Sequence, residues 1–226
     1  MAVRAMSEAD RDRVTVAVSA AEGASAGEIV TIVTEQSDSY RDVAIAWAAL
    51  VAFLALAALE IAPTFYLGLV DRVLGLWASE WTPRAVFGLA LIVATLKFAG
   101  MLVIQLWKPL RFALIPAPVK TARCHARAVT CFKVGAERRT HGRTGILIYL
   151  SLAEHRAEIV ADEAIAGKVD AAVWGDAMQA MLAHIRDGRI ADGMIAAVDK
   201  VGAVLAEHFP RAENDTNELP DRLIEV

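Results

Sequence analysis

The feature that most constrains this chain is a long apolar tract in its middle, Val43–Trp107, which separates two polar segments of the 226-residue sequence. Two windows inside the tract, Val43–Ala62 and Ala85–Trp107, contain one charged residue each, Glu60 and Lys97. About 20 helical residues cross the hydrocarbon core of a bilayer, so both windows are predicted to span a membrane. The tract therefore predicts a transmembrane hairpin, with the lipid bilayer as the first expected partner of the chain.

Basic residues near the predicted spans set the expected orientation. The connecting stretch Pro63–Arg84 is balanced in charge, whereas the region after the second span is rich in lysine and arginine: Lys108, Arg111, Lys120, Arg123, Arg127, Lys133, Arg138, Arg139 and Arg143. Basic residues favour the cytoplasmic side, so we expect both termini in the cytoplasm of a bacterium and both spans in its inner membrane. The N-terminal segment has no apolar core, so we expect no cleavable signal peptide.

Composition limits the classes of partner. The hydrophobic content of 56% and the mean hydropathy of +0.43 are high for a soluble protein, and the surplus lies in the central tract. A net charge of −4, with no KH, zinc-finger or helix-turn-helix signature, predicts no nucleic-acid partner. The basic segment 108–143 is instead expected to lie near anionic lipid headgroups. Cys124 and Cys131 are predicted to be reduced thiols, because their spacing matches neither a disulfide framework nor a structural zinc site.

The two polar segments contain complementary parts of one predicted domain. Glu28–Thr34 is a β-branched run that suits a strand buried on both faces. Gly145–Ser151 and Arg156–Ala161 are joined by a short polar turn, which predicts an antiparallel hairpin. Neither segment alone holds enough strands for a sheet. The predicted fold class is therefore α/β, a small mixed sheet covered by helices and interrupted by the transmembrane hairpin.

The expected organisation has four parts. Residues 1–42 hold the first helix and strand of the domain, and residues 43–107 hold the hairpin, with an amphipathic helix at the outer interface over 64–77. Residues 108–210 hold a basic juxtamembrane helix and the rest of the domain. Residues 211–226 form a polar tail that we expect to be irregular.

Short motifs along both segments carry a resemblance to a known family. They are Gly27-Glu28-Ile29-Val30, Gly142-Arg143-Thr144-Gly145-Ile146-Leu147-Ile148-Tyr149, Ser151-Leu152-Ala153-Glu154, Glu158-Ile159-Val160-Ala161-Asp162-Glu163, Trp174, Asp187-Gly188, Asp192-Gly193, Leu205-Ala206-Glu207-His208-Phe209-Pro210 and Asn217-Glu218-Leu219-Pro220-Asp221-Arg222-Leu223. In this order the chain resembles the TPM domain family, named after a thylakoid-lumen phosphatase-like protein, a photosystem II repair protein and a nematode receptor modulator. The resemblance is to its bacterial, membrane-inserted branch and implies an α/β sandwich.

The resemblance also implies calcium binding and phosphatase activity, but this chain departs from the associated motifs at two places. Members of the better-studied branch bind calcium, and some are acid phosphatases, with Asp-Asn-Gly just before the second core strand. Here the residues are Arg143-Thr144-Gly145, so a cation takes the place of a cation-binding carboxylate. After the third strand that branch has a glycine-rich turn ending in Glu, whereas this chain has Ala161-Asp162-Glu163-Ala164.

Asp162 and Glu163 are the candidate site residues. If the two later strands form a hairpin, both carboxylates come near His141, Arg143 and Thr144, at one edge of the sheet. Such a group can bind a divalent cation, calcium or magnesium, or an anion. The alternative is a surface salt bridge worth about 0–1 kcal/mol. No catalytic residue is predicted.

Two functions stay open at this point. The leading hypothesis is a scaffold or interaction module on the cytoplasmic face of the membrane, with an unknown protein partner. The alternative is a divergent metal-dependent phosphatase or hydrolase that uses Asp162 and Glu163. The intramembrane charges Glu60 and Lys97 are functional candidates by default, but transport through two spans would require a homo-oligomer.

Overall fold

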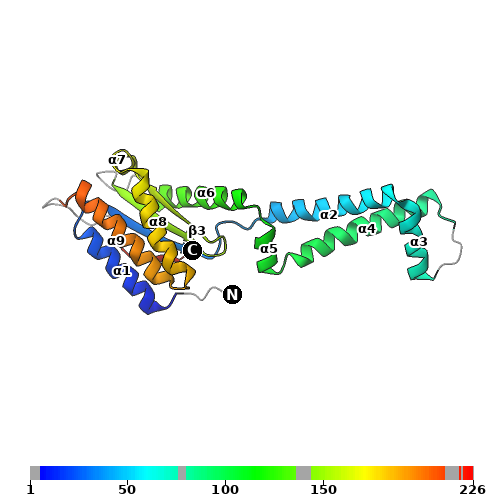
Figure 1. Ribbon diagram of the computed structural model, residues 1–226, viewed down its shortest axis with the longest axis horizontal. Coiled ribbons are helices and arrows are strands. Elements are labelled where there is room, and N and C mark those ends of the chain that lie inside the picture. The colour runs from blue at the N-terminus through cyan, green and yellow to red at the C-terminus, as the bar shows by residue number, and fades with distance from the viewer. Residues whose placement is uncertain (1–5, 76–79, 136–143, 212–218, 220, 226) are drawn as a thin grey trace. The chain divides into compact units, whose positions relative to one another are not determined.

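The computed structural model describes residues 6–75, 80–135, 144–211, 219 and 221–225 (Figure 1). The elements, in chain order, are α1 (Glu8–Glu22), β1 (Glu28–Thr34), α2 (Arg41–Ile61), α3 (Pro63–Leu74), α4 (Pro83–Ile104), α5 (Lys108–Leu114), α6 (Ala117–Gly135), β2 (Gly145–Ser151), β3 (Arg156–Ala161), α7 (Glu163–Ala166), α8 (Ala171–Arg186), α9 (Ile190–His208) and β4 (Ile224–Glu225). The chain divides into two compact units, one made of residues 1–38 and 117–226 and the other of residues 39–116.

The first unit is built around a mixed sheet with the strand order β3-β2-β1-β4. β1 pairs in parallel with β2 from Glu28 opposite Gly145 to Thr34 opposite Ser151, and β2 pairs antiparallel with β3. The predicted α/β class and the predicted antiparallel hairpin of β2 and β3 are therefore confirmed. All three longer strands occupy the residue ranges that the sequence predicted.

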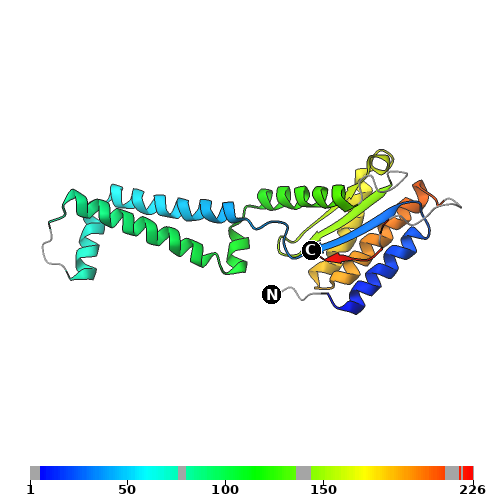
Figure 2. The same cartoon turned by 180° about the vertical axis from the view of Figure 1, so that it is seen from behind.

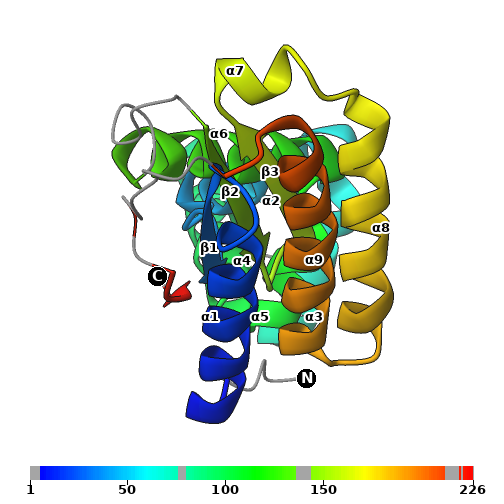
Figure 3. The ribbon, with the colours of Figure 1, turned by 90° about the vertical axis from the view of Figure 1, so that its left-hand side faces the viewer.

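Helices cover both faces of this sheet (Figure 3). One face packs against α1, α8 and α9, with Val18, Met181 and Val198 fully buried. The other face packs against α6 through Cys124, Ala128 and Phe132. Because each face is covered, successive side chains of β1 and β2 are buried along their whole length.

The C-terminal tail differs from its prediction. It was expected to be irregular, but Ile224 and Glu225 form β4, which lies beside β1 in the parallel direction (Figure 2). The guanidinium of Arg11 on α1 holds the Glu225 carboxylate in two hydrogen bonds of 2.8 and 3.0 Å. A two-residue strand has little pattern of its own, so the partner strand and this ion pair create it.

The second unit consists of α2, α3, α4 and α5. α2 and α4 pack side by side, and the Gln105 amide donates to the Ala44 carbonyl at 3.1 Å, which joins their ends. The Trp47 indole N–H donates to the Leu114 carbonyl at 2.9 Å and so holds the end of α5 against α2. Within the described residues, α2 and α4 are the two helices long and apolar enough to cross a membrane, and almost none of their side chains is buried.

Candidate functional site

Asp162 follows the last residue of β3 and directly precedes the first turn of α7. Its backbone N–H donates to the Gly145 carbonyl at 2.9 Å, and its carboxylate Oδ2 accepts from the Gly145 N–H at 3.3 Å. Thr144 lies at the same edge and donates through its hydroxyl to the Ala26 carbonyl at 2.8 Å. The structure thus places Asp162 beside the start of β2, as the hairpin required.

The other predicted members of this site are less informative. Glu163 lies in the first turn of α7 and is exposed. His141 and Arg143 fall outside the described residues. Asp162 is only 7% exposed, and its carboxylate accepts the backbone N–H of Gly145, the first residue of β2. A cation site at Asp162 and Glu163 therefore stays a prediction, and the geometry gives Asp162 a role in fixing the strand.

Two further carboxylates lie at the same end of the sheet, and sequence reasoning missed both. Glu22, the last residue of α1, accepts a hydrogen bond of 2.7 Å from the backbone N–H of Ile29 through Oε1. Glu28, the first residue of β1, accepts one of 3.2 Å from the N–H of Leu219 in the tail. Both side chains are more than nine-tenths buried. The one available signal was an acidic residue opening a strand that is otherwise apolar and β-branched.

The surroundings of Glu22 favour its neutral form. Burial raises the pKa of its carboxyl to about 8, and the negative charges of Glu28 and Asp221 act in the same direction, against the lowering effect of the Ile29 N–H. Its second oxygen, Oε2, accepts no hydrogen bond from a donor in the described part of the chain. Near neutral pH the protonated form of this carboxyl is therefore favoured.

Neither a metal site nor a reactive thiol emerges from the residues that the structure describes. No group of three or more His, Cys, Asp or Glu side chains among them is placed to hold a metal ion. Cys124 is fully buried under the sheet, and burial raises the pKa of its thiol to about 11. Cys124 and Cys131 are both free cysteines.

A buried polar cluster occupies the opposite end of the sheet, where β1 and β2 end. The Glu154 carboxylate accepts the hydroxyl of Ser151 and, at 2.7 Å, the backbone N–H of Ser37. The Ser37 hydroxyl lies 3.1 Å from the Tyr149 hydroxyl. This cluster fixes the last residues of the first chain segment, just before residue 39 where the second unit begins. Glu154 carried the family resemblance but was not predicted to have this role.

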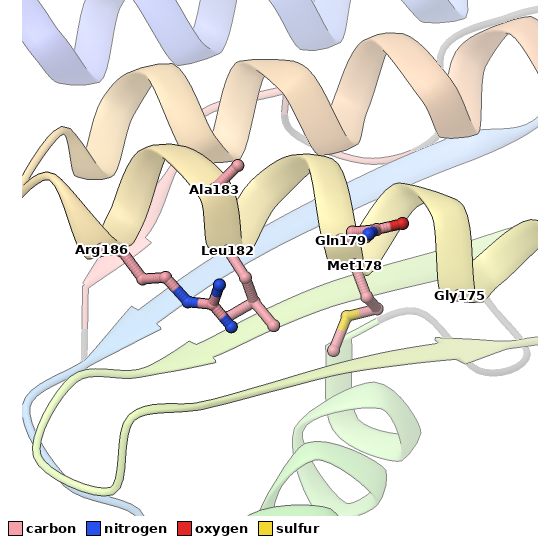
Figure 4. A pocket seen from close by; sticks show the side chains of 6 residues that line it. All are labelled: Gly175, Met178, Gln179, Leu182, Ala183 and Arg186. Atoms are coloured by element: carbon pink, nitrogen blue, oxygen red, sulfur yellow. The ribbon is translucent and has the colours of Figure 1, made fainter.

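A shallow hollow of about 330 Å³ lies along one side of α8 (Figure 4). Its lining residues all belong to that helix: Gly175, Met178, Gln179, Leu182, Ala183 and Arg186. Figure 4 shows the side chains of Met178, Leu182 and Arg186 on the side of α8 that faces the strands. α8 contacts β3, the outermost strand of the sheet. Met178 is partly buried and packs against the core of the first unit.

The two intramembrane candidates lie in the second unit. Glu60 is near the end of α2 and Lys97 is on α4, and both side chains are exposed. Neither makes an ion pair with another described residue. Lys97 lines a groove of about 480 Å³ between α2, α3 and α4, whose other lining residues are apolar or aromatic.

The chain is similar to known proteins both in sequence and in fold. Residues 119–204 match the family model of the TPM domain. The NMR structure of the BA42 protein from the psychrophilic bacterium Bizionia argentinensis is similar, with a TM-score of 0.57 and 15% sequence identity over 100% of this chain and 99% of that one. At this identity the likeness shows the fold alone. No curated protein matches the chain. The predicted resemblance is confirmed over residues 119–204, which match the TPM domain.

Proposed function

We propose that this chain is a membrane-anchored TPM-domain protein, whose domain acts as an interaction module on the cytoplasmic face of a bacterial inner membrane. The observation that carries the proposal is that the domain is assembled from two segments, and that two apolar helices lie between those segments in the sequence. An insertion of this kind fixes where the domain acts without supplying a catalytic group.

Exposure of the two apolar helices supports the membrane anchor. A core helix of a soluble protein passes the same test of length and composition, but its side chains are buried. Here 11% of the apolar window in α2 and none of that in α4 is buried. Lipid is the environment in which so much exposed apolar surface is stable.

α6 adds an electrostatic argument for the cytoplasmic side. Its Arg127 and Lys133 are exposed, and they belong to the basic segment that follows the second span. Basic residues close to a span favour the cytoplasmic side and attract anionic lipid headgroups. The proposal therefore includes contact between this segment and anionic lipids.

The alternative, a metal-dependent hydrolase, gains little from the geometry. The carboxylate of its leading candidate, Asp162, already accepts the Gly145 N–H. Calcium or magnesium binding stays a prediction that a thermal-shift screen with each cation addresses directly. A cation-specific rise in Tm that disappears in Asp162→Asn would favour the hydrolase.

The anchor and its orientation are tested together. Reporter domains fused to the N-terminus, inserted at Gly75, and fused to the C-terminus should report cytoplasm, outside and cytoplasm. The protein should stay in the membrane fraction through an alkaline carbonate wash. An external C-terminus or release by carbonate would overturn the proposal.

A further inference from the structure

The outer edge of β3 pairs with no other strand among the described residues. β3 is the terminal strand in the order β3-β2-β1-β4, and its one partner among the described strands is β2. Peptide groups along an antiparallel strand alternate between facing the partner strand and facing away from it. One side of β3 therefore presents backbone groups with no strand to pair with.

The register identifies these groups. The N–H of Asp162 donates to the carbonyl of Gly145, its opposite number, so the pairs that face β2 fall at Asp162 and at alternate residues before it. Ala157, Ile159 and Ala161 consequently direct their N–H and C=O groups away from β2. Among the described residues, no backbone hydrogen bond from outside the sheet reaches these three.

The helix beside this edge provides a matching surface. The side chains of Ala157, Ile159 and Ala161 lie on the face of the sheet that α8 and α9 cover. The hollow on α8 borders this face, with half-buried Met178 and Leu182 along it. An extended chain paired with β3 would direct every second side chain toward these two residues.

A charge is available at one end of the hollow. Arg186 lies in the last turn of α8 and is exposed, and no described residue forms an ion pair with it. Its neighbours Asp187 and Asp192 are held by Arg189 instead. A carboxylate on an incoming chain would therefore find an unused guanidinium, which binds carboxylates through two hydrogen bonds.

We propose that β3 and the hollow on α8 bind an extended segment of a partner protein, which adds a fifth strand to the sheet, buries alternate apolar side chains against Met178 and Leu182, and sets an acidic group on Arg186. Strand addition draws affinity from main-chain hydrogen bonds and specificity from the alternate side chains. This inference rests on the proposed interaction function and names the class of its partner.

The test uses the full-length chain in lipid nanodiscs and a displayed library of random octapeptides, from which one selected peptide is synthesised. The selected sequences should alternate apolar and polar residues and contain an acidic residue near one end. Binding of the synthetic peptide should slow amide hydrogen exchange at Ala157, Ile159 and Ala161 by at least tenfold. The amides of Glu158 and Val160 already face β2 and should change little.

Variants separate strand addition from general stickiness. Arg186→Glu and Leu182→Asp should each weaken peptide binding at least tenfold. Lys200→Glu, the same change of charge at an exposed position of α9, should not. Methylating alternate peptide nitrogens on the side that faces β3 should abolish binding, and methylating the other nitrogens should leave it intact. Matching Tm values for the variants and the wild type show that the fold is retained.

Three results would overturn the inference. The library could yield no binding peptide, or a peptide could bind without slowing exchange at the three amides. Alternatively, before any peptide is added, the three amides could already be protected to a degree that rises with protein concentration. The last result would assign the edge to a second copy of the chain. These outcomes are independent of the anchor. A chain that stays in the membrane but binds no peptide keeps the proposed anchor and loses this site, and one that carbonate releases loses the anchor.

Discussion

The backbone N–H of Ile29 donates a hydrogen bond of 2.7 Å to the Glu22 carboxylate, which joins the end of α1 to the first residues of β1. The same carboxyl is more than nine-tenths buried and has acidic neighbours in Glu28 and Asp221. One group thus serves as an acceptor that the fold needs and as a charge that the fold disfavours. The consequence is a dependence of stability on pH.

We expect Glu22→Gln to stabilise the protein, and the gain to grow with pH. The native pKa of Glu22 is about 8 against an ordinary value of 4.5, so the folded state binds more protons than the unfolded state between these values. The contribution of Glu22 to stability is therefore greatest below pH 4.5, falls as pH rises, and is flat above about 8. Glutamine keeps the acceptor and cannot ionise. The gain should grow by several kcal/mol between pH 5 and pH 8, since one pKa unit corresponds to about 1.4 kcal/mol.

Thermal unfolding of the detergent-solubilised chain from pH 5 to pH 9 measures this effect. Glu8→Gln, on the exposed first turn of α1, is the matched control and should leave the pH profile unchanged. A gain that stays constant across this pH range would contradict the assignment.

Gly202→Val should destabilise the domain. A Cβ atom at Gly202 would lie 2.6 Å from the Cβ of Ala21, so α1 and α9 meet at a point that only glycine leaves open. Overpacking of this kind costs about 1–3 kcal/mol. Gly175→Ala, in α8, is the control, because a Cβ there meets nothing within 4 Å. That change should leave Tm equal or higher, since alanine favours a helix interior.

Asp162→Ala should lower stability by about 1–3 kcal/mol, because the buried N–H of Gly145 loses its carboxylate acceptor. Glu163→Ala, one residue later on the exposed side of α7, should change stability by less than about 0.5 kcal/mol. Urea unfolding of both variants gives the comparison. Equal effects would show that the two carboxylates act together, as a shared ligand site requires.

Glu154→Ala should be more damaging than Glu154→Gln. The alanine variant leaves the buried hydroxyl of Ser151 and the N–H of Ser37 without their acceptor, at about 1–3 kcal/mol for each buried group. Glutamine retains one carbonyl oxygen and should recover part of the loss. Unfolding free energies of the two variants, measured under one condition, check the order. Equal losses would show that the cluster contributes through packing alone.

The parts of this fold that the sequence predicted are those with strong local patterns. β1, β2 and β3 are runs of β-branched and aliphatic residues bounded by turns, and their limits agree with the structure. The start of α1 also has a local signal, because Ser7 is a favoured N-cap residue and its hydroxyl accepts the N–H of Asp10 at 3.1 Å. The predicted strand pairing also placed Asp162 beside the start of β2, although its hydrogen bond with the Gly145 N–H was not predicted.

The parts that escaped prediction depend on contacts far apart in the chain. The raised pKa of Glu22 comes from burial and from Asp221, almost two hundred positions away in the sequence. β4 exists because β1 offers it a partner. The open edge of β3 depends on which strand is last in the sheet, and a strand's own residues do not carry that information.

The division of the domain into two segments also sets an order of events during synthesis. β1 leaves the ribosome first, but its partner β2 follows only after residues 35–144 have been made. During that interval α2 and α4 are synthesised. The apolar, β-branched strand β1 meanwhile has no partner strand on either edge. Closure of the sheet is therefore a late step, and both helices are synthesised before it can occur. A lesion in either helix should leave β1 open to proteases or to aggregation, even though the domain's own sequence is intact.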